Sequence, residues 1–398
     1  MIILYEYHDV LLNQVNDTFS RYLIDGIHWN QRMLAIKGPR GSGKTTLMLQ
    51  YIRYHLKEPR ERALYVTADH YWFYTHNLVE TADEFYKNGG RYLFIDEVHK
   101  YPNWSRELKN IYDGYPDLKV VFSASSALDI YRGESDLSRR VITYELPGLS
   151  FREFLKLEGH ADFPAISWED LMSCPNDLAA KIVRAIHPLP LFRRYLRYGY
   201  LPIFMESPVE EVPVRLNQVI NAIVETDLAF NVGYNQGTAF KVKKLLGVLA
   251  ESVPFKPNIS ALARKLDVGR ETIYAWLVQL ENARLLNLLT AQGRGVSVLQ
   301  KPEKVYLENP NLSYALKPVP DIGSLRKTFL LNQLVNARLD VTVPEKGDFL
   351  VSGVHIEVGG KNKDATQVKS ADQYLIAADD IEIGFGKKIP LWLFGFLY

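Results

Sequence analysis

The chain has 398 residues, of which 47% are hydrophobic and 23% are charged, a composition typical of a globular protein with two to four domains and not of a disordered one. Its 47 Lys and Arg residues almost balance its 46 Asp and Glu residues, which excludes a polycation that coats nucleic acid or an anionic membrane through its overall charge. The single cysteine, Cys174, excludes an internal disulfide and a multi-cysteine metal site.

The start of the chain, MIILYEYHDV, contains neither a basic leader nor a small-residue cleavage site, and no later stretch has the apolar length of a membrane span. A lone free thiol also suits a reducing compartment. We therefore expect a cytoplasmic protein without a membrane partner.

Between Arg32 and Glu145, short apolar runs alternate with segments whose apolar residues recur at helical spacing. This alternation predicts a parallel sheet flanked by helices, because each intervening helix returns the chain to the same end of the sheet. The predicted strands are 33–37, 63–67, 92–96, 119–123 and 141–145, and the predicted helices between them are 44–54, 77–87 and 104–112.

The first of these strands runs into the sequence GPRGSGKT, which fits the phosphate-loop pattern G-x-x-x-x-G-K-[ST] between a strand and a helix. Glycines let backbone N–H groups approach a phosphate, and the amino end of the following helix adds partial positive charge. Lys44 is expected to bridge the β- and γ-phosphates of ATP, and the Thr45 hydroxyl to bind Mg²⁺. A glycine-rich turn without a ligand is the alternative. The predicted nucleotide-binding residues are Gly38, Pro39, Arg40, Gly41, Ser42, Gly43, Lys44, Thr45 and Thr46.

Two acids follow the strand predicted at 92–96. Asp96, at its carboxyl end, is placed to support Mg²⁺ through the water shell of the ion. Glu97 points differently and could polarise the attacking water as a general base. Solvated acids at a strand end would look the same in sequence.

The run predicted as the fourth strand ends in the small hydroxyl residues Ser123, Ser125 and Ser126, which either sense the γ-phosphate or only form a turn. Arg139 and Arg140 precede the fifth strand. One of them could act as an arginine finger on a neighbouring subunit, or the two could be a surface pair. Ser123, Ser125 and Arg140 are counted among the candidate catalytic residues with Lys44 and Glu97.

Helical signals dominate after residue 148, beginning with a predicted capping box at Ser150 and Glu153. The segment 258–277 then predicts two helices joined by a tight turn, the spacing of a helix-turn-helix. Between Lys241 and Arg294 nine basic residues face four acidic ones, a local excess that suffices for weak, salt-sensitive contacts to DNA phosphates. Such a domain could equally be a rigid spacer or a protein-contact surface.

The last part returns to strand-like runs at 341–343, 349–351, 355–358 and 391–397. Asp348 and Glu357 look like the acids of a PD-(D/E)xK nuclease core. Two features argue against cleavage: Gly359 stands where that pattern has lysine, with Lys361 two residues farther on, and Arg326-Lys327 lie where a glutamate is common. A nuclease-like scaffold used for binding is the alternative.

As a whole, the chain resembles prokaryotic AAA-type ATPases that carry a C-terminal domain of unknown function. The resemblance rests on GPRGSGKT at 38–45, LFIDEVH at 93–99, FSASS at 122–126, LPGLSFREF at 146–154, YLRYGYLP at 195–202 and KVYLEN at 304–309. It implies a RecA-like parallel-sheet core, a helical lid, a winged helix and a restriction-endonuclease-like α/β tail. It also implies that Ser123 or Ser125 is the γ-phosphate sensor and that Arg140 matches the arginine finger. In the family pattern a glycine usually precedes the finger arginine, whereas in this sequence Arg139 stands at that position.

We therefore expect four parts, which are a P-loop ATPase core (1–148), a helical lid (149–236), a winged-helix-like domain (237–300) and a nuclease-like α/β domain (301–398). The predicted function is a Mg²⁺-dependent ATPase acting as a nucleotide-driven switch, with ATP and ADP as ligands, DNA as a candidate partner and homo-oligomerisation required if a finger acts between subunits. The alternatives are a DNA-binding regulatory module in which nucleotide is structural, and a nuclease-like effector.

Overall fold

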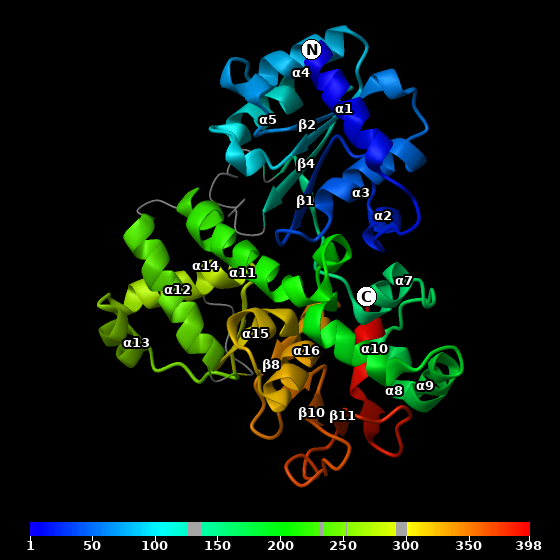
Figure 1. The fold of residues 1–398 in the computed structure, drawn as a ribbon, viewed down its shortest axis with the longest axis vertical. Helices are drawn as coiled ribbons and strands as arrows, with labels where there is room; N and C mark the ends of the chain where they lie inside the picture. The colour runs from blue at the N-terminus through cyan, green and yellow to red at the C-terminus, as the bar shows by residue number, and fades with distance from the viewer. Residues whose placement is uncertain (126–136, 138, 231–233, 252, 292–300) are drawn as a thin grey trace. The chain divides into compact units, whose positions relative to one another are not determined.

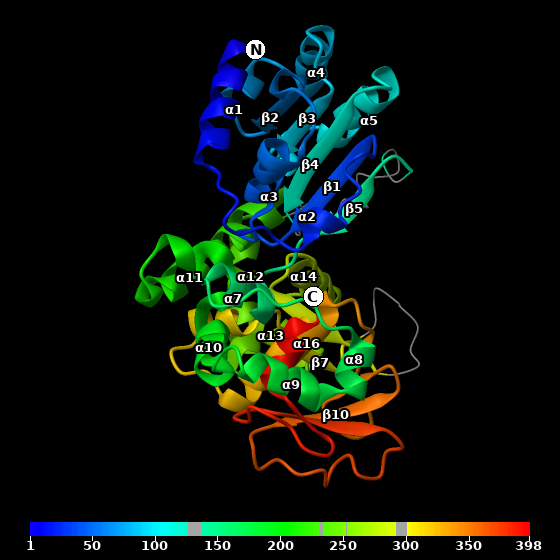
Figure 2. The same ribbon diagram turned by 90° about the vertical axis from the view of Figure 1, so that its right-hand side faces the viewer.

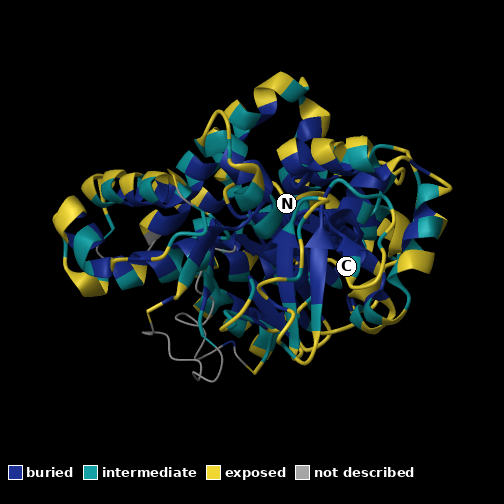
Figure 3. Ribbon diagram, turned by 90° about the horizontal axis from the view of Figure 1, so that it is seen from below, coloured by how far each residue is buried: buried dark blue, intermediate teal, exposed yellow. Residues whose placement is uncertain are grey.

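The computed structural model describes residues 1–125, 137, 139–230, 234–251, 253–291 and 301–398. The chain divides into two compact units, Met1–Pro147 and Gly148–Tyr398, which are drawn in Figure 1 and described separately here. Buried residues concentrate on the strands, whereas exposed residues lie along the outward faces of the helices (Figure 3).

The first unit is built on a five-stranded parallel sheet with the strand order β2-β3-β4-β1-β5. This order places β1, which leads into the phosphate loop, between β4 and β5, and it places β3 next to β4. The strands are β1 Met33–Gly38, β2 Ala63–Thr67, β3 Tyr92–Asp96, β4 Lys119–Ser125 and β5 Ile142–Glu145.

Alternate residues of each strand serve opposite faces of the sheet, as the two-residue period of a strand requires. In β1, Met33 and Ala35 pack in one core cluster with α4 and α5, whereas Leu34 and Ile36 pack in the other with α3. Figure 2 shows α3 and α5 on opposite sides of the strands. The helices of this unit are α1 Ile2–Gln14, α2 Leu23–Gly26, α3 Lys44–Gln50 with a π-helical turn at Tyr51–His55, α4 Leu78–Lys87 and α5 Trp104–Gly114.

Helix α1, which the sequence reading did not predict, lies along the edge strand β2. Its His8 is buried, and the ring Nδ1 accepts a hydrogen bond of 2.9 Å from the backbone N–H of Tyr65 in β2. An unpaired strand edge exposes backbone donors that invite pairing with other chains. His8 therefore satisfies one donor of this edge.

The second unit begins with helices. Ser150 caps the first of them, α7, in a capping box with Glu153, as the sequence predicted. The helices up to residue 230 are α7 Phe151–Leu157, α8 Trp168–Ser173, α9 Pro175–Val183, α10 Pro188–Arg194 with a π-helical turn at Tyr195–Gly199, and α11 Val212–Ala222 with a π-helical turn at Ile223–Asp227.

Three helices and a two-stranded antiparallel ribbon follow. Asn258 caps α13, and the left-handed Asp267 ends it, so that α13 and α14 form the predicted helix-turn-helix spacing. The second strand of the ribbon starts beyond residue 300, where we had expected a domain boundary, and residues 292–300 lie outside the described part. The elements are α12 Gln236–Glu251, α13 Ile259–Leu266, α14 Arg270–Asn282, β6 Leu286–Leu289 and β7 Lys304–Leu307.

The tail contains a five-stranded mixed sheet in the order β12-β11-β10-β9-β8. The predicted strand at 391–397 is wrong, because Leu391–Phe396 is a 3₁₀ helix. A short, continuous apolar run is compatible with a buried helix as well as with a strand, and periodicity cannot separate the two. The elements are α15 Pro310–Leu316, α16 Ile322–Asn336, β8 Val341–Thr342, β9 Phe349–Val351, β10 Val354–Gly359, β11 Tyr374–Ala378 and β12 Lys388–Pro390.

A buried polar network joins α15, α16 and the π-helical turn at Tyr195–Gly199. Tyr200 Oη donates to Glu308 Oε1 at 2.7 Å, and Asn332 Nδ2 donates to the same carboxylate at 3.0 Å. Burial raises the pKa of Glu308, whereas the hydrogen bonds donated by Tyr200 and Asn332 act in the opposite direction and lower it. The motifs YLRYGYLP and KVYLEN therefore meet in the core of this unit.

Candidate functional site: the phosphate loop and the strand-end acids

The phosphate loop lies between the end of β1 at Gly38 and the start of α3 at Lys44. Gly41 and Gly43 have φ values of 82° and 91°, in the left-handed region that glycine enters without strain. A Cβ on Gly38 would lie 2.9 Å from Ser42 Oγ and closer still to the Leu146 carbonyl oxygen. The glycines of the motif are therefore required by the shape of the loop itself.

Lys44 is buried and its ammonium is held inside the loop. Its Nζ donates to the carbonyl oxygens of Gly38 at 3.0 Å and Pro39 at 3.2 Å. Around it, Ser42 is buried, Arg40 is half-buried, and Thr45 and Thr46 are exposed on the first turn of α3.

Asp96 is the centre of a hydrogen-bond network that joins three strands and α3. Its Oδ2 accepts from Thr45 Oγ1 at 2.5 Å and from Tyr65 Oη at 2.7 Å. Its Oδ1 accepts from Ser123 Oγ and from the backbone N–H of Glu97, the latter at 3.1 Å. Because parallel strands end at the same edge of a sheet, this carboxylate and the phosphate loop face the same space.

Glu97 has a φ of 54°, a left-handed conformation that is uncommon for a residue with a side chain. Its backbone N–H donates to Ser123 Oγ at 3.0 Å, and its carboxylate lies 3.4 Å from His99 Nε2 and 3.5 Å from Lys100 Nζ. Strained backbone of this kind persists where the surroundings over-determine it. Ser123 therefore helps to orient Glu97 as well as Asp96.

Lys100 connects this acid to a second one. Its Nζ lies 2.5 Å from Asp69 Oδ2. Burial works against its charge, but the hydrogen bond to Asp69 and the nearby Glu97 outweigh it and raise the pKa of Lys100. For Asp69 burial likewise opposes the charge, and the hydrogen bonds from Lys100 and Thr67 nevertheless lower its pKa. The lysine is therefore a fixed cation beside Glu97.

The end of β4 also reaches the loop edge. Ser125 pairs in register with Gly38 of β1, and its backbone N–H donates to His99 Nδ1 at 3.4 Å. Ser126 lies outside the described residues. Of the two candidate sensors, Ser123 is thus the one bonded to both strand-end acids.

Arg139 and Arg140 lie just before β5, at the amino edge of the sheet, which is opposite to the phosphate-loop edge. Arg140 forms a two-pronged ion pair with Asp113, with Nε–Oδ1 and Nη2–Oδ2 distances of 3.0 and 3.1 Å. Arg140 therefore cannot contact a ligand at the phosphate loop of its own chain.

Two residues near the loop carried no sequence signal. Tyr65 reads as an ordinary core residue of β2, yet its hydroxyl donates to Asp96, and burial raises its pKa above the usual range, which keeps it a donor. Arg21 is buried, and its guanidinium donates to the carbonyls of Ser42 at 2.6 Å and Pro147 at 2.9 Å. It ties the phosphate loop to the last residue of the first unit.

The oxygen donors at this edge suit one ion in particular. Mg²⁺ prefers hard oxygen ligands, takes few protein carboxylates and keeps several waters. The Thr45 hydroxyl and the Asp96 carboxylate, 2.5 Å apart, supply two such oxygens beside a lysine ammonium that suits phosphate. The residues present therefore fit magnesium bound together with a phosphate ligand.

Residues 30–155 match a family model described as "AAA domain". The first unit is therefore similar to an AAA domain over most of its length. Residues 189–322 of the second unit match a model described as "Domain of unknown function (DUF8612)". A protein of Methanocaldococcus jannaschii named "Uncharacterized protein MJ1637" is 25% identical over 389 residues, which cover 90% of this chain and 82% of that protein.

Two solved structures are also similar to parts of this chain. "Structure of C. elegans PCH-2" is 16% identical with a TM-score of 0.29, over 54% of this chain and 66% of that one. "S. cerevisiae Hsp104-ADP complex" is 15% identical with a TM-score of 0.31, over 68% of this chain and 44% of that one. TM-scores this low establish no shared arrangement, and no function follows from them.

Asp348 and Glu357, the two acids of the tail that the sequence analysis singled out, are each paired with a lysine. Lys327 Nζ lies 2.6 Å from Asp348 Oδ1, and Lys363 Nζ lies 2.5 Å from Glu357 Oε1. Lys361, two residues beyond the position where the nuclease pattern has lysine, is exposed. Within the described ranges, no group of three or more His, Cys, Asp or Glu residues could hold a metal ion.

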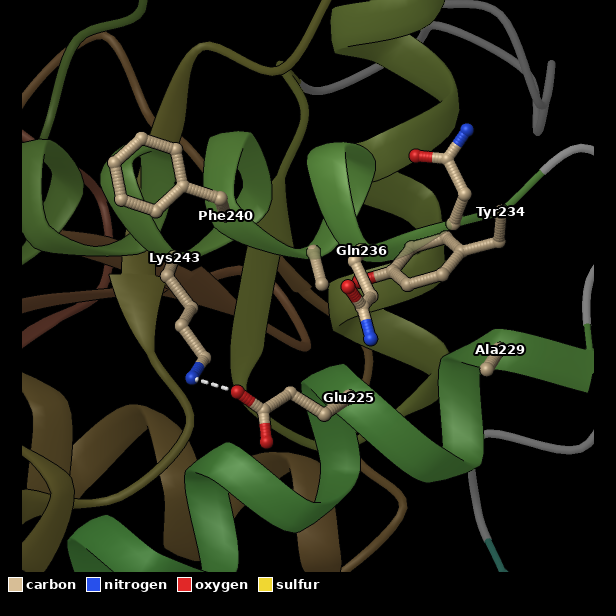
Figure 4. A pocket seen from close by; sticks show the side chains of 8 residues that line it. Glu225, Ala229, Tyr234, Gln236, Phe240 and Lys243 are labelled. Atoms are coloured by element: carbon tan, nitrogen blue, oxygen red, sulfur yellow. Dashed lines mark hydrogen bonds and ion pairs between the residues drawn. The ribbon is translucent and has the colours of Figure 1, made fainter.

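A cavity of about 550 Å³ lies beside α12, and Figure 4 shows that two of its lining side chains, Lys243 and Glu225, form an ion pair. Their ion pair of 2.5 Å joins the only charged side chains among the described residues that line it. Nothing there favours a charged ligand. Across the described part of the chain, none of the helices has the length and apolarity needed to cross a membrane.

Proposed function

We propose that this chain binds ATP with Mg²⁺ at the loop from Gly38 to Thr45 and hydrolyses it. The observation that carries the proposal is the bonding of Asp96, which joins the Thr45 hydroxyl, the Ser123 hydroxyl and the Glu97 backbone at the mouth of a glycine-rich loop. The AAA-domain match over residues 30–155 supports it.

The proposed roles follow from charge and reach. Backbone N–H groups of the loop and the Lys44 ammonium would hold the β- and γ-phosphates. Thr45 and Asp96 would hold Mg²⁺, which neutralises charge on those phosphates. Glu97 would orient a water and accept its proton while the water oxygen attacks the γ-phosphorus and the bond to the β-phosphate oxygen breaks, leaving ADP and phosphate. Ser123 would hold Glu97 in place.

Two substitutions separate binding from hydrolysis. Lys44→Ala should abolish ATP binding measured by calorimetry, because it removes the buried ammonium that lies inside the loop and would contact the phosphates. Glu97→Gln should keep the affinity for Mg-ATP and lower the steady-state turnover by roughly 10²-fold or more, as loss of a general base does. Lys57→Ala and Glu61→Gln, in the same unit away from the loop, are the matched controls.

If Lys44→Ala bound ATP as the unchanged protein does, the loop would not be the nucleotide site. If Glu97→Gln hydrolysed ATP at the original rate while binding was intact, the loop would bind nucleotide but Glu97 would not be the base. The two results overturn different parts of the proposal.

A second candidate function, DNA binding that is controlled by the nucleotide state, is favoured by the three helices and ribbon of residues 236–307. Arg270 is exposed on the first turn of α14, and Arg264 and Lys265 are exposed on α13. A winged-helix domain would use these cations on phosphates, with a steep dependence on salt. A gel-shift titration at several salt concentrations, with and without ATP, tests it, and salt-independent or absent binding would remove it.

A further inference from the structure

A cavity of about 520 Å³ opens within the second unit. It lies among α10 with its π-helical turn, α15, α16 and the segment after β11. π-helical turns of this kind often mark functional positions. The residues that line it are Arg193, Arg194, Leu196, Arg197, Tyr198, Tyr314, Ile322, Arg326, Asp379 and Asp380.

The charges of this lining leave an excess of cations. Four guanidiniums face two carboxylates, a net charge of +2. Both carboxylates are engaged by the largely buried Arg326, whose Nε lies 2.8 Å from Asp379 and whose Nη2 lies 3.1 Å from Asp380. The acids of the cavity are therefore neutralised and do not repel an incoming anion.

The other three arginines of the lining differ in how many of their guanidinium N–H groups already form hydrogen bonds or ion pairs. Arg194 donates to Glu158 and to the Tyr198 hydroxyl, both at 2.6 Å. Arg193 uses one nitrogen, at 2.9 Å from Asp380, and is otherwise exposed. Arg197 forms no hydrogen bond or ion pair with any residue that the structure describes. Its guanidinium can therefore bind a ligand without breaking an existing contact.

Arg193 and Arg197 are four residues apart on one helical face, so their side chains are neighbours. Like charges at this spacing repel each other, and an anion between them would relieve that repulsion. The planar guanidinium fork matches phosphate oxygens in pairs. Two adjacent guanidinium groups therefore match one doubly charged phosphate monoester better than a backbone of singly charged phosphodiesters.

The other wall of the cavity is aromatic and apolar. Tyr314 is half-buried; burial raises its pKa, while Arg197 pulls it back toward the usual value, so the two side chains are close enough to interact. Ile322 and Leu196 add apolar surface beside it. A flat, uncharged moiety next to a phosphate could rest against this wall.

From this arrangement we infer that the cavity is a binding site for a phosphate monoester, with Arg197 and Arg193 holding the phosphate and Tyr314 and Ile322 contacting the group attached to it. The phosphate could belong to a small metabolite or to the terminal phosphate of a nucleic-acid strand. This site is independent of the phosphate loop and does not rest on ATP hydrolysis.

Calorimetric titration of the full chain tests the inference, in a Lys44→Ala background so that the phosphate loop does not contribute. The probes are inorganic phosphate, AMP, and a short single strand with and without a 5′-phosphate. Arg197→Gln should weaken binding of phosphate and AMP roughly tenfold or more, the effect of losing a charge-assisted hydrogen bond. Arg197→Lys keeps the positive charge but loses the planar guanidinium, so its affinity for phosphate and AMP should lie between those of the original protein and Arg197→Gln.

Arg184→Gln is the matched control, because Arg184 is exposed on the same unit, outside the cavity, and carries the same charge change. Tighter binding of AMP than of phosphate assigns a small metabolite, whereas tighter binding of the 5′-phosphorylated strand assigns a strand end. Failure of all probes to bind, or equal losses of affinity in Arg197→Gln and Arg184→Gln, would overturn the inference.

Discussion

Asp96 accepts four hydrogen bonds, and they come from residues that are far apart in sequence. A carboxylate with so many donors is locked in a single orientation, and pre-orientation of this kind is what a metal-supporting acid requires. Glu97, one residue later, has its backbone turned into the left-handed region, so the two acids point to different partners.

Single-residue requirements in the loop can be tested at Gly38. Gly38→Ala should destabilise the protein by about 1–3 kcal/mol and weaken ATP binding, because the added methyl group meets the fixed Leu146 carbonyl. Denaturant unfolding and ATP calorimetry measure the two effects.

Gly114→Ala is its control, since a methyl group on this last residue of α5 meets no atom within 4 Å. We expect it to change the free energy of unfolding by less than about 1 kcal/mol. Equal effects of the two substitutions would show that packing around Gly38 does not constrain the loop.

At the scale of elements, helix α1 covers the edge of the sheet through a buried histidine. Burial lowers the pKa of His8 from 6.5 to about 4, with Asp9 opposing and Arg60 assisting that shift. A neutral ring is what the contact needs, because Nδ1 can accept the Tyr65 N–H only when it carries no proton.

This coupling predicts a pH dependence of stability. Between about pH 6.5 and 4 the unfolded chain binds a proton at His8 that the folded chain excludes, so stability present above pH 6.5 is lost as the pH falls toward 4. The loss should reach at most about 3 kcal/mol. His8→Asn, which keeps an acceptor but cannot titrate, should flatten this part of the profile measured by denaturant unfolding.

His28→Asn is the comparison, because His28 is exposed in the same unit and its replacement should leave the profile unchanged. A profile of the His8→Asn protein as steep as that of the original would mean that other groups cause the acid sensitivity.

At the scale of the whole molecule, the position of Arg140 bears on assembly. This arginine is at the sheet edge opposite to the phosphate loop, so it can act on a nucleotide only in another subunit. Its existing partner, Asp113, offers a way to separate a catalytic from a structural role.

If Arg140 is an intersubunit finger, Arg140→Ala should lower ATP turnover by about 10³-fold or more with ATP binding intact. Asp113→Asn removes the same ion pair but keeps the arginine, and should leave turnover nearly unchanged because a partly exposed pair contributes only about 0–1 kcal/mol. Turnover assays should be combined with mass determination in Mg-ATP. Equal turnover losses in the two proteins, or a protein that is fully active as a monomer, would exclude the finger.

The first unit was largely predictable from sequence. Its five strands begin and end within about two residues of the predicted positions, because buried parallel strands are short apolar runs bounded by turn residues. The structure places the loop between β1 and α3 and the two acids at the end of β3, in the positions that the motif spacing predicted. Their catalytic roles stay predictions, as do the lid, winged-helix and nuclease-like assignments of the second unit.

In the second unit, the local sequence pattern was less informative about secondary structure and side-chain pairing. The run at 391–397 is apolar at every position except Gly395 and carries no period, so only its tertiary surroundings select a 3₁₀ helix over a strand. The ion pair between Lys363 and Glu357 was not predicted, because no local pattern indicates which lysine the fold brings to this carboxylate.

The sequence by itself determined which residues form the loop and the strand-end acids on which the proposed ATP hydrolysis depends, since glycines, a lysine, a threonine and two acids in a strict local order have few other uses. Only the tertiary structure decided which distant side chains complete that chemistry, such as Tyr65 on Asp96 and Arg21 on the loop carbonyl, and which arginines gather around one cavity. The physical reason is that a motif acts through neighbours along the chain, whereas hydrogen bonds, burial and charge pairing depend on neighbours in space.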